Sequence, residues 1–231
     1  MHWLTLVLVG CGSHVQGEVD GEKPDPIRSS FWYQVGEGEN AITSVQLYSF
    51  GGSCTKAADN LVATTEAYRA FLTSMDVDAL VADLSAADQD NLPSELWNFS
   101  FVVTEAPGDA LEGSFSVEDQ TVAIGAYHQF DYNDYEKIKK EQNKDGYHVR
   151  SYASDGGSLE IKHFQEGGSL SGSADFVLLD LEGKDAGAVT ATLSAPHCED
   201  VEIAYAAYVD LLDRKSTRLN SSHLVISYAV F

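Results

Sequence analysis

The sequence is poor in basic residues. It contains 14 lysines and arginines against 36 aspartates and glutamates, which gives a formal net charge of −22. Nucleic acid is therefore not an expected partner, because contacts to phosphates are made mainly by lysine and arginine. The same charge argues against direct docking on anionic lipid headgroups. It remains compatible with positively charged partners or divalent cations, and it favours solubility in salty or crowded surroundings.

Short catalytic and cofactor-binding motifs are also missing. The chain has no Gly-x-Ser-x-Gly pattern, no glycine-rich dinucleotide motif and no phosphate-binding loop. Gly168–Gly172 places serines between glycines but does not match the first pattern. No His-x-His or Cys-x-x-Cys pair is present to begin a zinc site. We therefore predict a non-enzymatic protein with no cofactor. Structural or surface roles are expected for the four histidines near predicted strands, which are His128, His148, His163 and His197.

Long apolar runs are absent after the N-terminal region, and a transmembrane helix needs about 20 consecutive apolar residues. A shorter apolar run precedes Cys11, and its end, Leu8-Val9-Gly10-Cys11, resembles the lipobox of bacterial lipoproteins. The resemblance implies that residues 1–10 are a signal peptide and that Cys11 becomes a lipidated N-terminus carrying fatty acids such as palmitate. The alternative is a buried apolar strand that contains an ordinary cysteine.

The resemblance also implies a location and a partner. A lipidated Cys11 would anchor the chain to a membrane of the bacterial cell envelope, and several acyl chains on one residue give stable anchoring. The residue after Cys11 is Gly12 and not aspartate. By resemblance to lipoprotein sorting rules, this favours the outer membrane as the location. Residues 11–30 are rich in Gly, Ser, Asp, Glu and Pro, so we expect a flexible tether there.

Cysteine is scarce, with Cys11, Cys54 and Cys198 the only three. If Cys11 carries lipid, two cysteines remain in an exported and therefore oxidising compartment. We predict a disulfide between Cys54 and Cys198, which would typically contribute about 2–4 kcal/mol. The alternative is two free buried thiols, as in a cytosolic protein.

The C-terminal residues differ in composition from the rest. Asp213–Phe231 resembles one translated reading frame of a short-read sequencing adapter and places Arg214, Lys215 and Arg218 on a strongly acidic chain. The resemblance implies that the native domain extends only to about Leu212 and that the tail has no function. A genuine basic tail is the alternative.

Residues 31–212 are expected to form a single domain that is mainly β (α+β). Alternating apolar residues from Trp97 to Val103 are typical of a half-buried strand. Apolar residues spaced by three and four predict a helical insertion at about 56–92, with Thr55 as N-cap, and a helix is slightly favoured at 201–212. Hairpins are expected at 111–128 and at 147–164. Such closely spaced hairpins favour an antiparallel β-sandwich or a barrel-like sheet.

One acidic segment resembles a calcium loop in composition. Asp131, Asn133, Asp134 and Glu136 offer closely spaced oxygen ligands for a hard cation. The EF-hand pattern fails, because Tyr135 holds the fifth position and Glu136 replaces the required glycine. The alternative is a solvated acidic loop.

The sequence therefore favours a membrane-anchored envelope lipoprotein whose domain has a non-enzymatic binding, adhesion or structural role, with an envelope protein or a small ligand as partner. Exposed aromatics are enriched at interfaces, and the tyrosines that could form a contact surface are Tyr127, Tyr132, Tyr135 and Tyr147. A calcium- or small-ligand-binding domain is a second hypothesis. A third is a hydrolase whose histidines meet an acid and a serine only in space.

Overall fold

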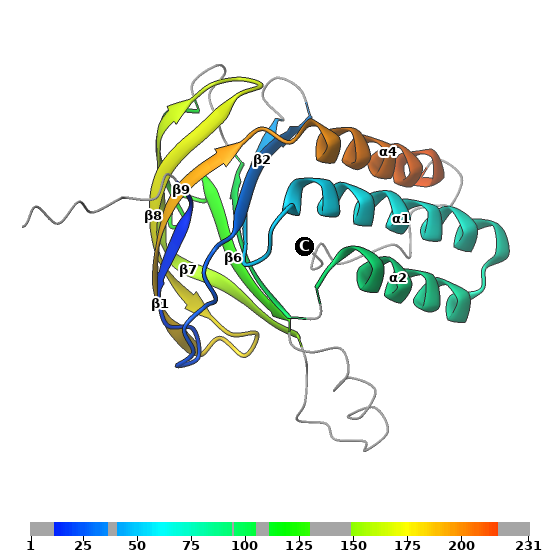
Figure 1. Ribbon diagram of the computed structural model, residues 1–231, viewed down its shortest axis with the longest axis horizontal. Coiled ribbons are helices and arrows are strands. Elements are labelled where there is room, and N and C mark those ends of the chain that lie inside the picture. Colours follow the sequence, from blue (N-terminus) through cyan, green and yellow to red (C-terminus); the bar gives the residue numbers. More distant parts are fainter. Residues whose placement is uncertain (1–11, 37–40, 94, 105–110, 130–148, 217–231) are drawn as a thin grey trace, which may run out of the picture.

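The computed structural model describes residues 12–36, 41–93, 95–104, 111–129 and 149–216. Nine strands form one curled antiparallel sheet, and three helices cover one side of it (Figure 1). Eight strands follow the order β1-β9-β8-β7-β6-β4-β3-β2, and β5 pairs with β7 off this path. The predictions of a mainly β, barrel-like fold and of a helical insertion are confirmed. The strands are β1 (His14–Gly17), β2 (Ser29–Val35), β3 (Ile42–Tyr48), β4 (Leu96–Val103), β5 (Gly113–Ser116), β6 (Val122–Gln129), β7 (Val149–Phe164), β8 (Ser169–Leu179) and β9 (Asp185–Pro196).

The main core lies on the inner face of the curled sheet. Every second residue of a strand points to this face, which is why the alternating apolar residues of β4 are buried there. Large side chains from the other strands complete it. The core side chains exposed by less than 2% include Trp32, Leu47, Phe99, Phe101, Leu159 and Phe176. Burial of apolar area at about 25 cal/mol per Å² makes this face the main source of stability.

The two ends of the sheet approach each other. Trp32 of β2 forms an isolated parallel bridge with His197, and its carbonyl oxygen accepts a hydrogen bond from the Cys198 amide at 2.8 Å. The Ser30 hydroxyl donates to the carbonyl oxygen of Ser194 in β9 at 2.7 Å. Contact between the ends protects edge groups that would otherwise be open to pairing with another chain.

The three helices are α1 (Ser53–Ser74), α2 (Val77–Asn91) and α4 (Glu199–Ser216), with α1 in contact with both of the others. The helices α1 and α4 pack against β2, and α2 packs against α1. A second, smaller core joins α1 and α4 to the outer face of the sheet through Phe31, Ala58 and Val201. The helix expected at 201–212 is therefore confirmed, and it continues four residues past the expected domain end at Leu212.

One detail of the helical insertion differs from expectation. The helix α1 begins at Ser53 after Gly52, whose φ of 74° ends the preceding segment, so Thr55 is not its N-cap. The helix α2 begins at Val77, where the Asp76 side chain accepts a hydrogen bond from the Ala79 amide at 3.0 Å. This capping bond satisfies one of the free amides at the helix start.

The prediction of a flexible tether at 11–30 is wrong for the described part of that segment. His14–Gly17 forms β1, which pairs antiparallel with Thr190–Thr192 and Val189 of β9. Val19 is fully buried in the main core. Asp20 and Gly21, at φ of 52° and 75°, form the tight turn that positions it. A polar composition did not reveal this segment because strand pairing uses backbone groups and the segment places few apolar side chains in the core, namely Val15, Val19 and Ile27.

Both predicted hairpins in the middle of the chain are also wrong. Residues 149–164 form the single long strand β7, which continues through 154–158 by a register shift between Ser154 and Gly156 instead of turning back. The strands β5 and β6 both run antiparallel to β7, so they follow one another along it and do not pair together. The glycines in this segment allow a bulge as readily as a turn.

Gly157 provides a direct test of the β7 bulge. Its φ is 123°, and a Cβ atom there would overlap the carbonyl oxygen of Asp175 and the backbone of Phe176 on β8. We expect Gly157→Ala to lower the free energy of unfolding by about 2 kcal/mol or more, because the added methyl group forces the paired strands apart. Urea denaturation measures the effect. Gly51→Ala, where no atom lies within 4 Å of the added Cβ, is the matched control and should change little.

Candidate functional site

A polar groove crosses the outer face of β1, β9, β8 and β7. These strands lie on the opposite side of the molecule from the helices (Figure 1). The groove has a volume of about 380 Å³, within the range of about 300–1,000 Å³ that is typical of small-ligand sites. The polar residues lining it are His14, Gln16, Ser158, Glu160, Ser173, Asp175, Thr190 and Thr192.

Strand register arranges these eight side chains in two rows that cross the sheet. In the first row His14 lies opposite Thr192, which is opposite Ser173, which is opposite Glu160. The second row places Gln16, Thr190, Asp175 and Ser158 next to one another in the same manner. Neighbouring members of a row are on adjacent strands, about 5 Å apart, so their polar groups can act together on one ligand.

Side-chain length explains why this face is hollow. The inner strands β8 and β9 contribute the short side chains of Ser173, Thr190 and Thr192, which form the floor. The longer side chains of Gln16 on β1 and Glu160 on β7 stand at the two sides. The same strands carry apolar residues on the opposite, buried face. Because side chains alternate between the two faces of a strand, the hydroxyl-bearing side chains must point outward.

The groove carries negative charge. Glu160 and Asp175 are its two carboxylates, and both groups line it among hydroxyls. The Ser173 hydroxyl lies 3.5 Å from a carboxylate oxygen of Glu160, and the Lys162 ammonium lies 3.2 Å from the same oxygen. A ligand here meets carboxylate oxygens, which accept hydrogen bonds, and serine and threonine hydroxyls, which both donate and accept them.

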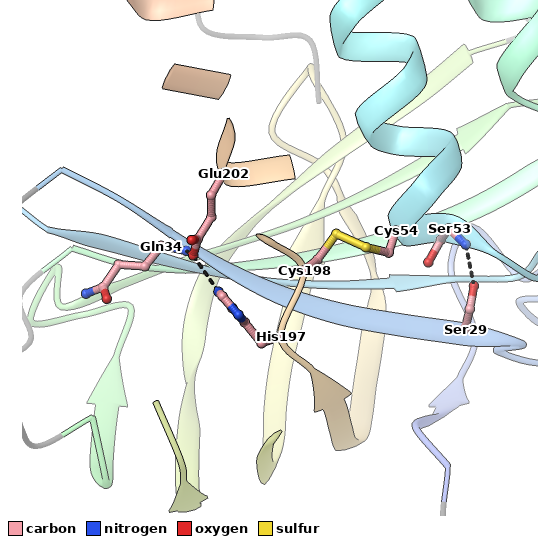
Figure 2. The surroundings of a disulfide bond; sticks show 7 residues. All are labelled: Ser29, Gln34, Ser53, Cys54, His197, Cys198 and Glu202. Carbon is pink, nitrogen blue, oxygen red and sulfur yellow. Dashed lines mark hydrogen bonds and ion pairs between the residues drawn. A yellow bond between two sulfur atoms is a disulfide. The ribbon is translucent and has the colours of Figure 1, made fainter. Parts of the chain in front are cut away.

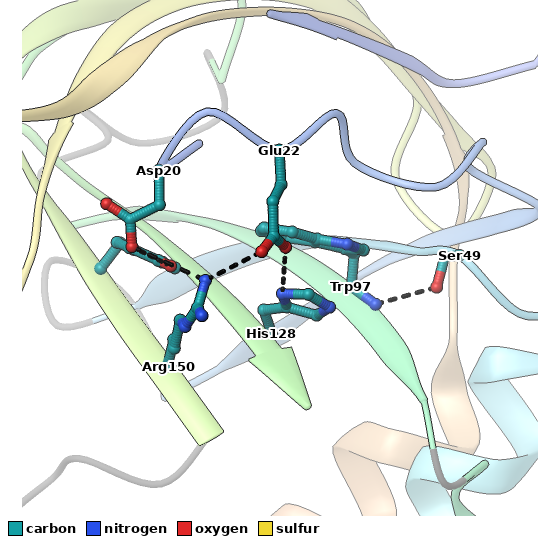
Figure 3. A network of polar contacts seen from close by, with 7 residues as sticks. Asp20, Glu22, Ser49, Trp97, His128 and Arg150 are labelled. Atoms are coloured by element: carbon teal, nitrogen blue, oxygen red, sulfur yellow. Dashed lines mark hydrogen bonds and ion pairs between the residues drawn. The ribbon is translucent and has the colours of Figure 1, made fainter. Parts of the chain in front are cut away.

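A second polar cluster closes one end of the sheet interior (Figure 3). The turn after β1 brings Glu22 within 3.2 Å of Arg150 and within 3.7 Å of the His128 ring. Asp20 accepts a hydrogen bond from the Tyr152 hydroxyl at 2.8 Å. The His128 ring stacks on Trp97 with 3.8 Å between ring centroids, and it is only 3% exposed. These contacts hold the β1–β2 connection over the end of the core.

Burial changes proton binding in this cluster. Removal of the His128 ring from water lowers its pKa to about 4, although nearby Glu22 favours the charged form. Burial also raises the pKa of Tyr152 to about 12, aided by its hydrogen bond to Asp20. At neutral pH the cluster therefore contains a neutral imidazole and a neutral phenol, which suits packing better than acid–base chemistry.

The predicted disulfide between Cys54 and Cys198 is confirmed, with 5.9 Å between the two Cα atoms (Figure 2). It joins the first turn of α1 to the segment between β9 and α4. Beside it, a carboxylate oxygen of Glu202 lies 2.8 Å from the His197 ring and accepts a hydrogen bond from the Gln34 amide at 2.6 Å. These contacts tie α4 to β2 and link the helical layer to the sheet.

Most of the other residues singled out from the sequence lie in parts of the chain that the structure does not describe. Cys11 and the predicted calcium ligands Asp131, Asn133, Asp134 and Glu136 lie outside the described residues, as do His148, Tyr132, Tyr135 and Tyr147. Tyr127 is half-buried and donates to Gln129 at 2.9 Å.

Three of the four described histidines are dispersed. His128 is buried against Trp97, His163 is exposed beside Glu112, and His197 lies beside Glu202, whereas His14 lines the groove. Within the described ranges, no three His, Cys, Asp or Glu side chains are grouped as metal ligands. In the same ranges, no helix has the length and apolar character needed to cross a bilayer.

No protein-family model, curated protein sequence or solved structure matches this chain. The site must therefore be interpreted from its own geometry. Sequence reasoning missed the groove because His14 and Gln16 lie in the segment expected to be a tether. The alternation of hydroxyls with apolar residues in β8 and β9 was a usable signal, since it defines a polar outer face.

Proposed function

We propose that this protein is an exported bacterial lipoprotein, anchored in the cell envelope through Cys11, whose domain binds a ligand and catalyses no reaction. The observation that carries the proposal is the Cys54–Cys198 bond. Structural disulfides form in oxidising compartments and are rare in the bacterial cytosol. With these two cysteines paired, Cys11 is the third cysteine of the sequence, and it lies at the end of the lipobox-like motif.

The position of β1 supports a short connection to the membrane. His14 is three residues after Cys11 and is already paired with Thr192. Three extended residues span at most about 11 Å. A lipid on Cys11 would hold the domain close to the bilayer surface with the β1 side nearest to it. Gly12 favours the outer membrane as the destination.

The polar groove supports a binding role. Hydroxyls, carboxylates and an amide converge on this groove, which has a volume of about 380 Å³. Such a set can orient a ligand by hydrogen bonds. His128, His163 and His197 lie in separate parts of the described structure and none of them lines the groove, so binding is the better-supported role.

The proposal predicts the location of the full-length protein in bacterial cells. The wild-type chain should fractionate with membranes and stay there after a high-salt wash, because several acyl chains give stable anchoring. Cys11→Ser should appear in the soluble fraction. The double variant Cys54→Ser/Cys198→Ser is the control, because it removes the two cysteines other than Cys11. It should remain with membranes. Wild-type protein in the soluble fraction, or Cys11→Ser retained on membranes, would contradict the proposal.

A further inference from the structure

We propose that the groove across β1, β9, β8 and β7 binds an uncharged oligosaccharide. This inference rests on the proposed binding role and specifies its ligand. The groove has an unusual concentration of small polar groups in one place, since four of its lining residues are the hydroxyl-bearing Ser158, Ser173, Thr190 and Thr192. Sugar hydroxyls need partners that both donate and accept hydrogen bonds, and serine and threonine hydroxyls do both.

The carboxylates and the amide add the stronger partners. Asp175 lies between Thr190 and Ser158 in its row, and Glu160 ends the other row beside Ser173. A carboxylate has two oxygens, so it can accept hydrogen bonds from two adjacent hydroxyls of one sugar ring. Gln16, at the opposite side, can donate to a ring or hydroxyl oxygen. The two rows therefore offer paired contacts at each side of the groove.

The dimensions agree with a short oligosaccharide. Each row crosses four adjacent strands, which is three inter-strand spacings or about 14 Å. Short side chains on β8 and β9 leave the middle open, and the longer ones on β1 and β7 bound it. A chain of a few sugar rings lying across the strands would contact both rows along its length.

The charge of the groove excludes anionic ligands. Glu160 and Asp175 would repel phosphorylated or carboxylated sugars, and the nearby Lys162 is engaged with Glu160 at 3.2 Å. The chain as a whole carries a net charge of −22. A peptide is disfavoured by position, because peptides that bind to sheets usually add to an exposed edge through backbone groups. The groove offers side chains on the face of paired strands.

The same sugar chemistry could come from two sources. One is the headgroup of a neutral glycolipid in the anchoring membrane, which is within reach because His14 of the groove is three residues from Cys11. The other is a glycan outside the membrane. Both present vicinal hydroxyls to the same two rows.

The test uses the full chain with Cys11→Ser, which is expected to be soluble. Calorimetric titration with chitotriose, cellotriose and maltotriose should show saturable binding of at least one of them. Asp175→Asn and Thr192→Val should each weaken that binding by about tenfold, the effect of losing one or two good hydrogen bonds. Ser173→Ala should also weaken that binding. Ser171→Ala, at the next outward position of β8 and outside the groove, is its matched control and should leave affinity unchanged.

A second arm separates the two sources. Co-sedimentation with phosphatidylcholine vesicles that contain a neutral glycolipid, compared with plain vesicles, reports binding to headgroups. Sugar-dependent binding in either arm that falls in the groove variants, with unchanged melting temperatures, supports the proposal. Absence of binding to all saccharides and glycolipid vesicles at millimolar sugar concentration overturns it, and so does binding that the groove variants leave intact. Either failure would leave membrane anchoring through Cys11 standing, since fractionation tests that separately.

Discussion

Replacing both Cys54 and Cys198 by alanine is expected to lower the free energy of unfolding by about 2–5 kcal/mol. The bond joins residues separated by 144 positions. Closing a loop of that length restricts the unfolded chain strongly, and the chain-entropy relation gives about 5 kcal/mol, the upper end of the range. Cys198 is buried beside Phe31 and Val201, so the variant also loses packing in the second core.

Equilibrium denaturation in urea measures this effect. The midpoint of the double variant should move to lower urea, and reduction of the wild type with dithiothreitol should move its midpoint in the same direction. Cys11→Ser is the control, because it removes a cysteine outside the bond and should not change the midpoint. A loss below about 1 kcal/mol in the double variant would mean that α1 and α4 are held to the sheet mainly by packing.

Acid is expected to destabilise the protein through His128 by about 3 kcal/mol. Burial against Trp97 lowers the pKa of His128 from its ordinary 6.5 to about 4 in the folded state. The unfolded chain therefore binds the proton more tightly. The stabilisation from the neutral ring is complete above pH 6.5, and it is lost progressively as the pH falls from 6.5 to about 4.

Urea denaturation at a series of pH values checks this dependence. His128→Gln removes the titrating group, so its stability should be lower at neutral pH and should change less between pH 6.5 and 4 than that of the wild type. His163→Gln is the control, because His163 is an exposed histidine with a side chain 60% accessible. If His128→Gln retains the full wild-type pH dependence, the buried His128 ring is not its cause.

The sequence predicted the features of the fold that depend on side-chain periodicity. The alternating residues of β4 and the three- and four-residue spacing in α1 each place apolar groups on one face, so their structures followed directly. The single long strand β7 could not be predicted in this way. Its glycines at 156 and 157 are compatible with a turn or a bulge, and only pairing with β8 selects the bulge.

The candidate site depended on pairing between distant strands, which periodicity does not reveal. The disulfide was predictable because the resemblance of Leu8-Val9-Gly10-Cys11 to a lipobox assigned Cys11 to a lipid and left one pairing of the other two cysteines. The groove could not be predicted, because it forms only when β1 pairs with β9 and brings Gln16 beside Thr190. The segment that contains β1 has the composition of a linker. It forms a strand because the rest of the sheet provides an edge with which it can pair.

The most direct test is mass spectrometry of the wild-type protein purified from bacterial cells and digested without reduction. We expect an N-terminal peptide that begins at Cys11 and carries acyl chains, together with a linked pair of peptides containing Cys54 and Cys198. An unmodified peptide that runs through Gly10 and Cys11, or Cys54 and Cys198 recovered as free thiols, would contradict this expectation.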